Sequence, residues 1–181
     1  CETIMACGTA ALREARNAGK FLREAARVGI PIRVISGEEE ARLIHQAVSH
    51  AIPFPEGAAA LVDIGGGSTE ITWVDGGRAV ASLSLPWGVQ RIADAVGGSN
   101  PPTLQDFMRL ERFMRKVLKK ARKGLPKGLP VPDLVLGTAG TLLDLARGAA
   151  EGTGFDRHQL HRFQRRLWRT DNPGLWVSGL L

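Results

Sequence analysis

Cysteine is nearly absent from this sequence of 181 residues, which contains only Cys1 and Cys7, both near one end. Two neighbouring cysteines provide neither a disulfide framework nor the paired spacing of a structural zinc site. Long apolar runs are also missing, because no stretch approaches the length needed to cross a bilayer. The opening CETIMACGTA lacks the basic and then apolar pattern of a secretion signal. We therefore expect a cytoplasmic protein with no membrane partner.

The composition is that of a globular chain with excess positive charge. Hydrophobic residues make up 44% of the sequence, which is enough to bury the core of one ordinary domain or two small ones. The formal net charge is +6 and the pI is about 10.0. Such a balance favours an anionic partner, which could be nucleic acid, a phosphorylated metabolite, polyphosphate or a lipid headgroup. The charge does not choose among these partners.

Hydrophobic spacing predicts an α/β chain with a mixed sheet and flanking helices. Helices are expected over about residues 10–28, 38–49 and 103–123, and again over LLDLARGAA. Ser36 followed by Glu39 is a capping box that starts the second helix, and Thr103 could cap the third. The segment DGG, residues 75–77, is a hairpin turn signal. From residue 151 the chain is basic and then loses any clear pattern. The expected strands are IPIRVIS, AAALVDIG, STEITWVD, RAVASLSL and the start of DLVLGTAGT.

The segment LVDIGGGSTE, residues 61–70, places consecutive glycines between two predicted strands. Backbone N–H groups of such a turn converge on an anion, and the following hydroxyls add donors. Asp63 and Glu70 flank the turn, where a carboxylate could hold a hydrated Mg²⁺. The glycines join strand to strand, unlike the strand-to-helix dinucleotide motif. The alternative is a tight turn with a solvated acid. The phosphate-binding candidates are Gly65, Gly66, Gly67, Ser68 and Thr69.

The segment SGEEEARLI places three acids at a predicted helix start. Negative charge is favoured there by the helix dipole, so stabilisation of the helix end is one interpretation. The other is that one acid is a general base that orients water for attack on phosphorus. The pattern itself does not select which acid.

Two further features could meet phosphate. The segment GTAGT is a strand followed by small and hydroxyl residues, and its candidates are Gly137, Thr138, Gly140 and Thr141. It could contact a second phosphate or a nucleoside, although ordinary strand-to-helix turns look similar. Arg13 lies near a helix start, where it could act as a bidentate phosphate donor or remain a solvated surface residue.

The helix over residues 103–123 is strongly basic. A solvated face is the usual interpretation of such a run, but the imbalance also suits docking of a polyanion. His158 and His161 have a metal-like spacing without completing acids or cysteines, and Ser68 has no evident His partner for serine hydrolase chemistry. The polar faces carry Arg109, Arg112, Arg115, Lys116, Lys119, Lys120, Arg122 and Lys123 against the single acid Glu111.

Several segments together resemble one known family. The segments GTAALREARNAGKFL, GIPIRVISGEEEARLIHQAV, LVDIGGGSTEI, SLSLPWGVQRI and VLGTAGTLLDLARG occur in this order. In order and spacing they resemble the exopolyphosphatase / guanosine pentaphosphate phosphohydrolase (Ppx/GppA) family of the actin, sugar-kinase and Hsp70 superfamily. The resemblance runs from residue 1 to about residue 148, and SGEEEARLI followed by DIGGGSTE is its most specific part.

The resemblance implies RNase H-like domains, as in actin-like ATPases, with a cleft between two of them. Residues 1–46 would be the end of the first domain, 47–150 the second domain with its phosphate loop, and 151–181 an atypical C-terminal segment. A first phosphate loop of the type DIGSNS and a later Gly-rich, acid-containing strand are not found in this sequence. We therefore expect an incomplete two-domain architecture that is poorly active by itself.

The resemblance also implies an activity and residue roles. The family removes the terminal phosphate of inorganic polyphosphate, or the 5′ phosphate of pppGpp, with Mg²⁺ and often a monovalent cation such as K⁺. Glu40 matches the general base, and Arg13 matches the arginine that meets the substrate phosphates. Asp63 and Glu70 match the metal-linked acid and the acid that closes the loop. Residues 65–69 match the second phosphate loop, and Gly137, Thr138, Gly140 and Thr141 match the loop that faces the nucleotide in related ATPases.

Two other functions remain open from the sequence. One is an ATPase or sugar kinase of the actin-like type, although SGEEEARLI favours the phosphatase. The other is a non-catalytic module that binds polyanions through the basic helix and the glycine turn. The sequence does not separate polyphosphate from pppGpp. It gives no reason to expect a specific nucleic acid partner, and the resemblance implies a homodimer as one candidate assembly.

Overall fold

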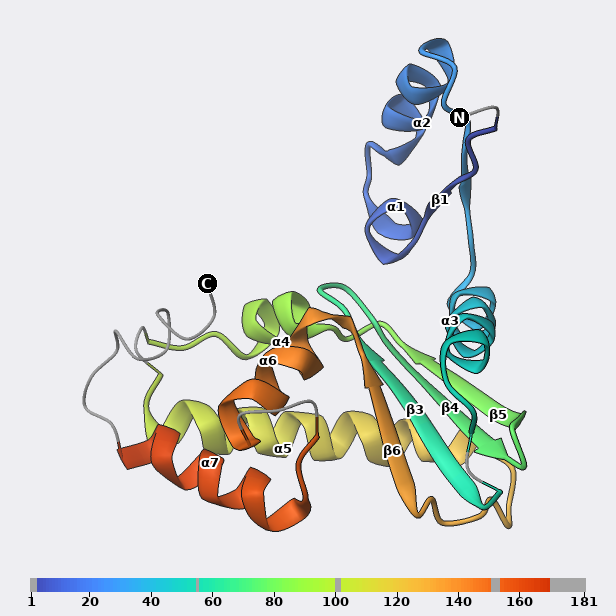
Figure 1. The fold of residues 1–181 in the computed structure, drawn as a ribbon. Helices are drawn as coiled ribbons and strands as arrows, with labels where there is room; N and C mark the ends of the chain where they lie inside the picture. Colours follow the sequence, from blue (N-terminus) through green and yellow to red (C-terminus); the bar gives the residue numbers. More distant parts are fainter. Residues whose placement is uncertain (1–2, 55, 100–101, 151–153, 170–181) are drawn as a thin grey trace.

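The computed structural model describes residues 3–54, 56–99, 102–150 and 154–169. Residues 3–35 form a small N-terminal unit that stands beside a larger region built on a sheet (Figure 1). The N-terminal unit contains β1 (Ala6–Gly8), α1 (Ala10–Glu14), α2 (Ala18–Arg27) and β2 (Ile32–Val34). Its two strands pair in parallel. Cys1 and the segment 170–181 lie outside the described residues.

The single helix predicted over residues 10–28 is wrong, because the chain breaks between α1 and α2. Ala15 has a ψ of 127°, an extended conformation that ends α1. Asn17 then precedes α2, in which no residue is buried. Apolar spacing continues across the break, so the pattern alone did not reveal it. The break keeps α1 short and lets Arg13, near its end, donate to the backbone oxygen of Ile35.

The helix α3 (Gly37–Ala51) leads from the N-terminal unit to the sheet. The side chain of Ser36 accepts a hydrogen bond of 3.1 Å from the backbone of Glu39, which confirms the predicted cap. The helix lies against one edge strand of the sheet and the strand next to it, and Ala41 on its inner side is 1% exposed.

The sheet has four strands in the order β5-β4-β3-β6, which confirms the predicted mixed sheet. The strands are β3 (Ala58–Ile64), β4 (Thr69–Asp75), β5 (Arg78–Leu85) and β6 (Leu134–Thr138). β3, β4 and β5 form an antiparallel meander, and β6 joins β3 in parallel. The predicted hairpin turn between β4 and β5 is confirmed, since Gly76 and Gly77 have φ values of 52° and 77° there.

The remaining helices are α4 (Val89–Val96), α5 (Leu104–Ala121) with a 3-10 turn η1 (Arg122–Gly124), α6 (Ala139–Ala150) and α7 (Arg157–Arg169). Neither α4 nor α7 was predicted. α4 follows Gly88, which offers no side-chain cap. α7 does carry a start pattern, because Asp156 and Gln159 cap each other's backbone N–H groups at 2.7 Å.

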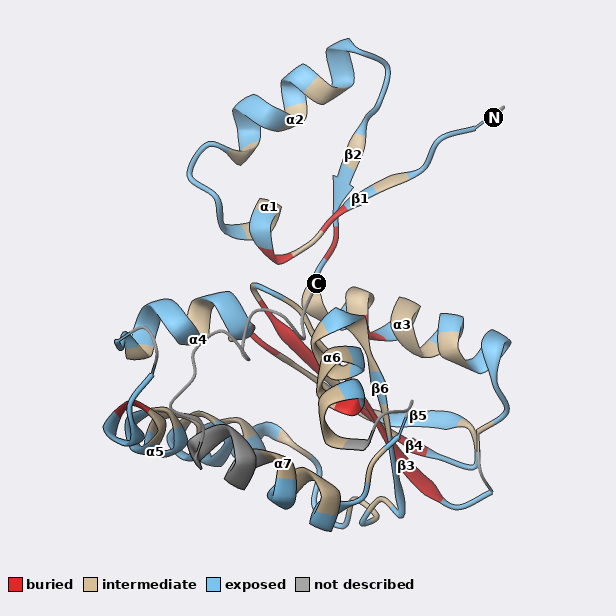
Figure 2. Cartoon of the chain, turned by 60° about the vertical axis from the view of Figure 1, so that its left-hand side comes forward, coloured by how far each residue is buried: buried red, intermediate tan, exposed pale blue. Residues whose placement is uncertain are grey.

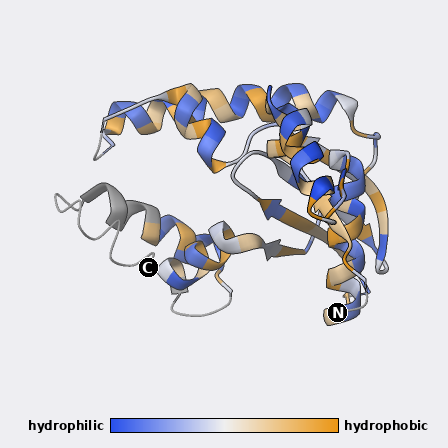
Figure 3. Cartoon of the chain, turned by 90° about the horizontal axis from the view of Figure 1, so that it is seen from above, coloured by the Kyte–Doolittle hydropathy of each residue, from blue (hydrophilic) through white to orange (hydrophobic). Residues whose placement is uncertain are grey.

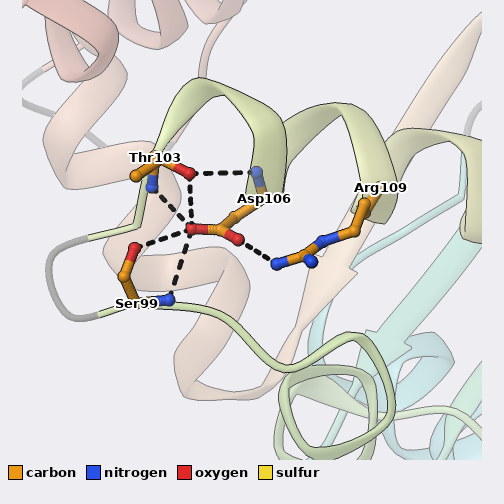
Figure 4. Close-up of polar contacts among 4 residues, drawn as sticks. All are labelled: Ser99, Thr103, Asp106 and Arg109. Carbon is orange, nitrogen blue, oxygen red and sulfur yellow. Dashed lines mark hydrogen bonds and ion pairs between the residues drawn. The ribbon is translucent and has the colours of Figure 1, made fainter.

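The start of α5 is the most heavily bonded turn of the sheet region (Figure 4). Thr103 and Asp106 form a capping box, in which the backbone N–H of Thr103 donates to Oδ2 of Asp106 at 2.7 Å. The backbone and hydroxyl of Ser99 donate to the same oxygen, and Arg109 pairs with the other. These donors hold the pKa of Asp106 well below its ordinary value, chiefly through the bonds from Thr103. The carboxylate thereby fixes the loop after α4 to α5.

The core lies in the sheet. Buried residues follow the strands, whereas the helices are exposed on their outer sides (Figure 2). Leu61 of β3 is 2% exposed and Val74 of β4 is fully buried. Hydrophilic and hydrophobic residues alternate along the helices, as expected for amphipathic helices that cover a sheet (Figure 3). Within the described part of the chain, no helix combines the length and the apolar character needed to span a membrane.

Candidate active site

The glycine loop, residues 65–67, connects β3 to its antiparallel neighbour β4, as predicted. Its carbonyl oxygens turn toward α4. The oxygens of Gly65 and Gly66 accept hydrogen bonds of 3.0 Å from the backbone N–H groups of Val89 and Gln90, in the first turn of that helix. Gly88 allows this approach, because a Cβ there would lie 2.3 Å from the Gly65 oxygen. The loop therefore satisfies N–H groups that a helix start leaves unpaired.

The N–H groups of the loop differ in their bonding: that of Gly65 donates to the backbone oxygen of Ser68 at 3.0 Å. Among the described residues, none accepts a hydrogen bond from the backbone N–H of Gly66, Gly67 or Ser68. Successive unpaired N–H groups in a glycine-rich turn form the kind of concavity that binds an anion. The hydroxyls are directed elsewhere, since Ser68 donates to Glu70 and Thr69 donates to the backbone oxygen of Trp87 at 2.8 Å.

Arg13 and Glu40 form an ion pair of 2.8 Å between α1 and α3. Nη1 of Arg13, which makes this contact, also donates to the backbone oxygen of Ile35 at 2.9 Å. The start of α1 touches the glycine loop, because a Cβ on Gly67 would lie 2.9 Å from that of Ala10. The two residues predicted as catalytic thus meet each other, on helices at the edge of the predicted phosphate loop.

Glu70 lies opposite Asp63 in the β3–β4 pairing and is 2% exposed. Its two carboxylate oxygens accept hydrogen bonds from Ser84 at 2.8 Å and from Ser68 at 3.3 Å. Burial raises the pKa of Glu70; the hydrogen bond from Ser84 opposes this shift, and the negative charges of Glu40 and Asp63 add to it. Those two charges act on Glu70 because the predicted acids converge from three different elements.

The GTAGT segment reaches the same place through one residue. Thr138 pairs with Asp63 in the sheet, and its hydroxyl donates to Oδ2 of Asp63 at 2.5 Å. Gly137 packs on the side chain of Leu142. The chain passes from β6 into α6 at Ala139, which has a φ of 69° in the left-handed region. Gly140 faces open space, and Thr141 lines an apolar cavity between α4 and α5.

The acids fit a magnesium ion only in part. Oδ1 of Asp63 forms no hydrogen bond with a described residue, so it is available to a metal. Both oxygens of Glu70 already accept hydrogen bonds from serines, which suits contact through a water molecule. No set of three or more His, Cys, Asp or Glu residues in the described ranges could hold a metal by itself. Mg²⁺ commonly takes one or two carboxylates and completes its shell with water and substrate phosphates.

Several contacts that support the site were not predicted. Ser84 holds Glu70, and Gly37 packs so closely on Ser84 that a Cβ there would lie 2.0 Å from the hydroxyl oxygen. Arg91 of α4 forms an ion pair with Glu14 of α1 and donates to the Pro86 oxygen at 3.0 Å. The helix that supports the glycine loop is therefore tied to the helix that carries Arg13. No sequence pattern links Glu14 to Arg91, because their contact is purely tertiary.

Comparisons with known proteins identify the family and the fold of this chain. The model of the Ppx/GppA phosphatase family matches residues 1–171. The crystal structure of the Aquifex aeolicus member is 33% identical over 87% of this chain and 49% of its own, with a TM-score of 0.64. An exopolyphosphatase from Cytophaga hutchinsonii ATCC 33406, 24% identical over 98% of this chain and 61% of its own, shares the fold with a TM-score of 0.80. The chain spans about half the length of the Aquifex protein. The chain belongs to the Ppx/GppA phosphatase family.

Proposed function

We propose that this chain provides the glycine loop, the general base and the metal-linked acid of a phosphohydrolase. Its substrate would be the terminal phosphate of inorganic polyphosphate or the 5′ phosphate of pppGpp. The observation that carries the proposal is that α1, whose Arg13 forms the ion pair with Glu40, touches the loop in which the N–H groups of residues 66–68 have no acceptor among the described residues. An acid, an arginine and an anion-binding turn at one place suit phosphoryl transfer, which depends mainly on positioning and fixed charge.

The proposed reaction uses the chain's residues in distinct roles. The N–H groups of residues 66–68 bind oxygens of the transferred phosphoryl group, and Arg13 donates to a neighbouring phosphate oxygen. Water attacks phosphorus while Glu40 accepts its proton, the bridging P–O bond breaks, and the leaving phosphate keeps the electron pair. Asp63, held by Thr138, would hold Mg²⁺, whose charge would stabilise the phosphate oxygens. A monovalent cation such as K⁺ is part of the same proposal.

The test replaces the base while preserving its shape. Because the chain spans half the length of the Aquifex relative, the assay compares this chain with a full-length family member that carries Gln at the position aligned with Glu40. Phosphate release from polyphosphate and from pppGpp is measured with Mg²⁺. We expect a loss of about 10²–10⁴-fold in the full-length variant, with binding retained. The 181-residue chain should turn over slowly, because half of the proposed clamp holds substrate loosely.

The control is Glu38→Gln, which changes an exposed acid in the same helical turn and should leave hydrolysis unchanged. Full activity in the Glu40→Gln protein would overturn the assignment of the base. Turnover of the 181-residue chain at the rate of the full-length protein would contradict the incomplete site.

A further inference from the structure

One face of α5 carries a line of positive charge. Arg112, Lys116, Lys119, Lys120 and Lys123 recur at intervals of four, three, one and three residues along α5 and η1, so they share one side of the helix. All of them are exposed. The opposite side is apolar, where Met114 and Leu118 line the cavities between α5 and the rest of the sheet region. We name these five cations the basic stripe.

Within the described part of the chain, the basic stripe has no partners of opposite charge. Arg109 and Arg115, its neighbours on α5, form ion pairs with Asp106 and Glu111. No carboxylate among the described residues forms an ion pair with any member of the stripe. From residue 112 to residue 123 the charges extend over roughly 16 Å of helix. Unpaired like charges in a row raise their mutual repulsion, which an external polyanion would relieve.

Stabilisation of the helix end does not account for the whole stripe. Positive charge is favourable in the last helical turn, which explains Lys119 and Lys120. Arg112 and Lys116 lie further back, beyond the range over which that effect acts. Because Arg112 and Lys116 lie on the same side as the terminal lysines, we look for an anionic binding partner to explain the whole row.

We propose that the basic stripe is an accessory binding site for the inorganic polyphosphate chain, separate from the glycine loop. The inference rests on the proposed function, because the same polymer would supply the terminal phosphate. None of the five residues of the stripe is aromatic, and the described aromatic side chains near α5 lie on its other side, where Trp73 lines the cavity next to Leu118. Phe107 lines the cavity beneath α5, and Phe113 packs edge-on against Trp87 at 4.8 Å between ring centres. Single-stranded nucleic acids usually require aromatic side chains on which bases stack, so a polymer of phosphate alone fits better.

The stripe and the predicted catalytic residues belong to opposite faces of the sheet. Gly37 of α3 packs on Ser84 beside Glu70, whereas Leu118 of α5 faces the cavity lined by Ile71. Successive residues of a strand point to opposite faces, so Glu70 and Ile71 mark the two sides. One short phosphate chain would therefore not occupy both sites. A long chain held at the stripe would raise the local concentration of its own ends near the loop.

The experiment measures binding of long-chain polyphosphate and of tripolyphosphate to the 181-residue chain at several salt concentrations. The stripe variant is Lys116→Gln, Lys119→Gln, Lys120→Gln and Lys123→Gln. The control variant removes the same charge from exposed cations elsewhere, by Arg16→Gln, Lys20→Gln, Arg23→Gln and Arg78→Gln. We expect the stripe variant to lose at least about tenfold in affinity for the long chain, with a shallower salt dependence, since each lost phosphate contact removes counterion release. The control should lose much less, and tripolyphosphate binding should not differ between the two variants.

An equal loss of affinity in both variants would overturn the proposed binding site at the stripe, because it would show only a general effect of net charge. Single-stranded DNA of matched charge that competes as well as polyphosphate would overturn the choice of ligand. Circular dichroism of both variants confirms that α5 is intact. Binding is measured without turnover, so a failed stripe is distinguishable from a failed base assignment at Glu40.

Discussion

The N-terminal unit and the sheet region contribute to one site but are packed very differently. In the N-terminal unit the buried apolar residues are Ala10 and Ile35, while Phe21 and Val28 are 52% and 74% exposed. In the sheet region the first four residues of β3 and most of β4 are buried (Figure 2). The glycine loop therefore rests on a packed core, whereas Arg13 depends on a few specific contacts. The difference indicates that the proposed phosphate loop and Arg13 have separate structural supports.

The largest expected effect compares two valines in strands. Val74→Ala empties a fully buried position of β4 and should lower the free energy of unfolding by about 2–3 kcal/mol. Val34→Ala acts on a residue of β2 that is 36% exposed, and should cost less than about 1 kcal/mol. Urea unfolding followed by circular dichroism measures both. Similar losses of unfolding free energy in the two variants would contradict the looser packing that we infer for the N-terminal unit from its exposed residues.

A smaller effect is expected from two glycines that touch the loop from different sides. A Cβ on Gly88 would lie within 2.5 Å of backbone atoms of Gly65 and Gly66, which are fixed by the start of α4. We expect Gly88→Ala to cost about 2 kcal/mol, because backbone must shift.

The matched control is Gly67→Ala, whose new methyl would meet only the side chain of Ala10, at 2.9 Å. Because the N-terminal unit has few buried contacts, we expect α1 to shift and accommodate the methyl group, so the loss of unfolding free energy should stay below about 1 kcal/mol. Thermal unfolding of the two variants checks the order, and a larger loss in Gly67→Ala would reverse the comparison.

The smallest effect concerns acid stability. Hydrogen bonds from Thr103 and Ser99 lower the pKa of Asp106, so its contribution is present above the ordinary value of 3.8 and is lost as the pH falls through the lowered pKa. We expect Asp106→Asn to lower Tm at neutral pH, and the gap from the unchanged protein to close in acid.

Glu39→Gln is the counterpart at the border of the N-terminal unit. Its hydrogen bond from Arg33 lowers the pKa of Glu39, but this pair is exposed and is screened by salt. Its gap should be smaller and should vanish in high salt. Thermal melts across acid pH at two salt concentrations measure the Tm difference of each variant from the unchanged protein. A Tm difference for Asp106→Asn that did not change with pH would show that the lowered pKa of Asp106 is not its cause.

Local patterns predicted those parts of the fold that local forces decide. The caps at Ser36 and Thr103 and the turn at Gly76 were visible in sequence, since each depends on residues a few positions apart. The break after Glu14 and the helix α4 were missed. α4 begins without a side-chain cap, because its first N–H groups bond to a loop more than twenty residues earlier. Such a start leaves no pattern near its own residues.

The candidate site likewise has parts that could be predicted from local sequence and parts that could not. The glycine loop could be predicted from its residues and strand context, and Arg13 and Glu40 were singled out by resemblance to the family. Their direct contact could not be predicted, because it joins residues 27 positions apart across two helices. The support from Ser84 and Arg91 was missed for the same reason. The roles of Arg13 and Glu40 in chemistry stay predictions until the variants are assayed.

The shared peptide groups of the glycine loop have one further consequence. A peptide unit is rigid, so a turn that releases the carbonyl of Gly65 or Gly66 from α4 also swings the following N–H away from the anion position. The proposed binding of phosphate at this loop would therefore be thermodynamically linked to the first turn of α4. Loosening that turn would weaken binding of the proposed anion, and by reciprocity the anion would make the turn harder to open.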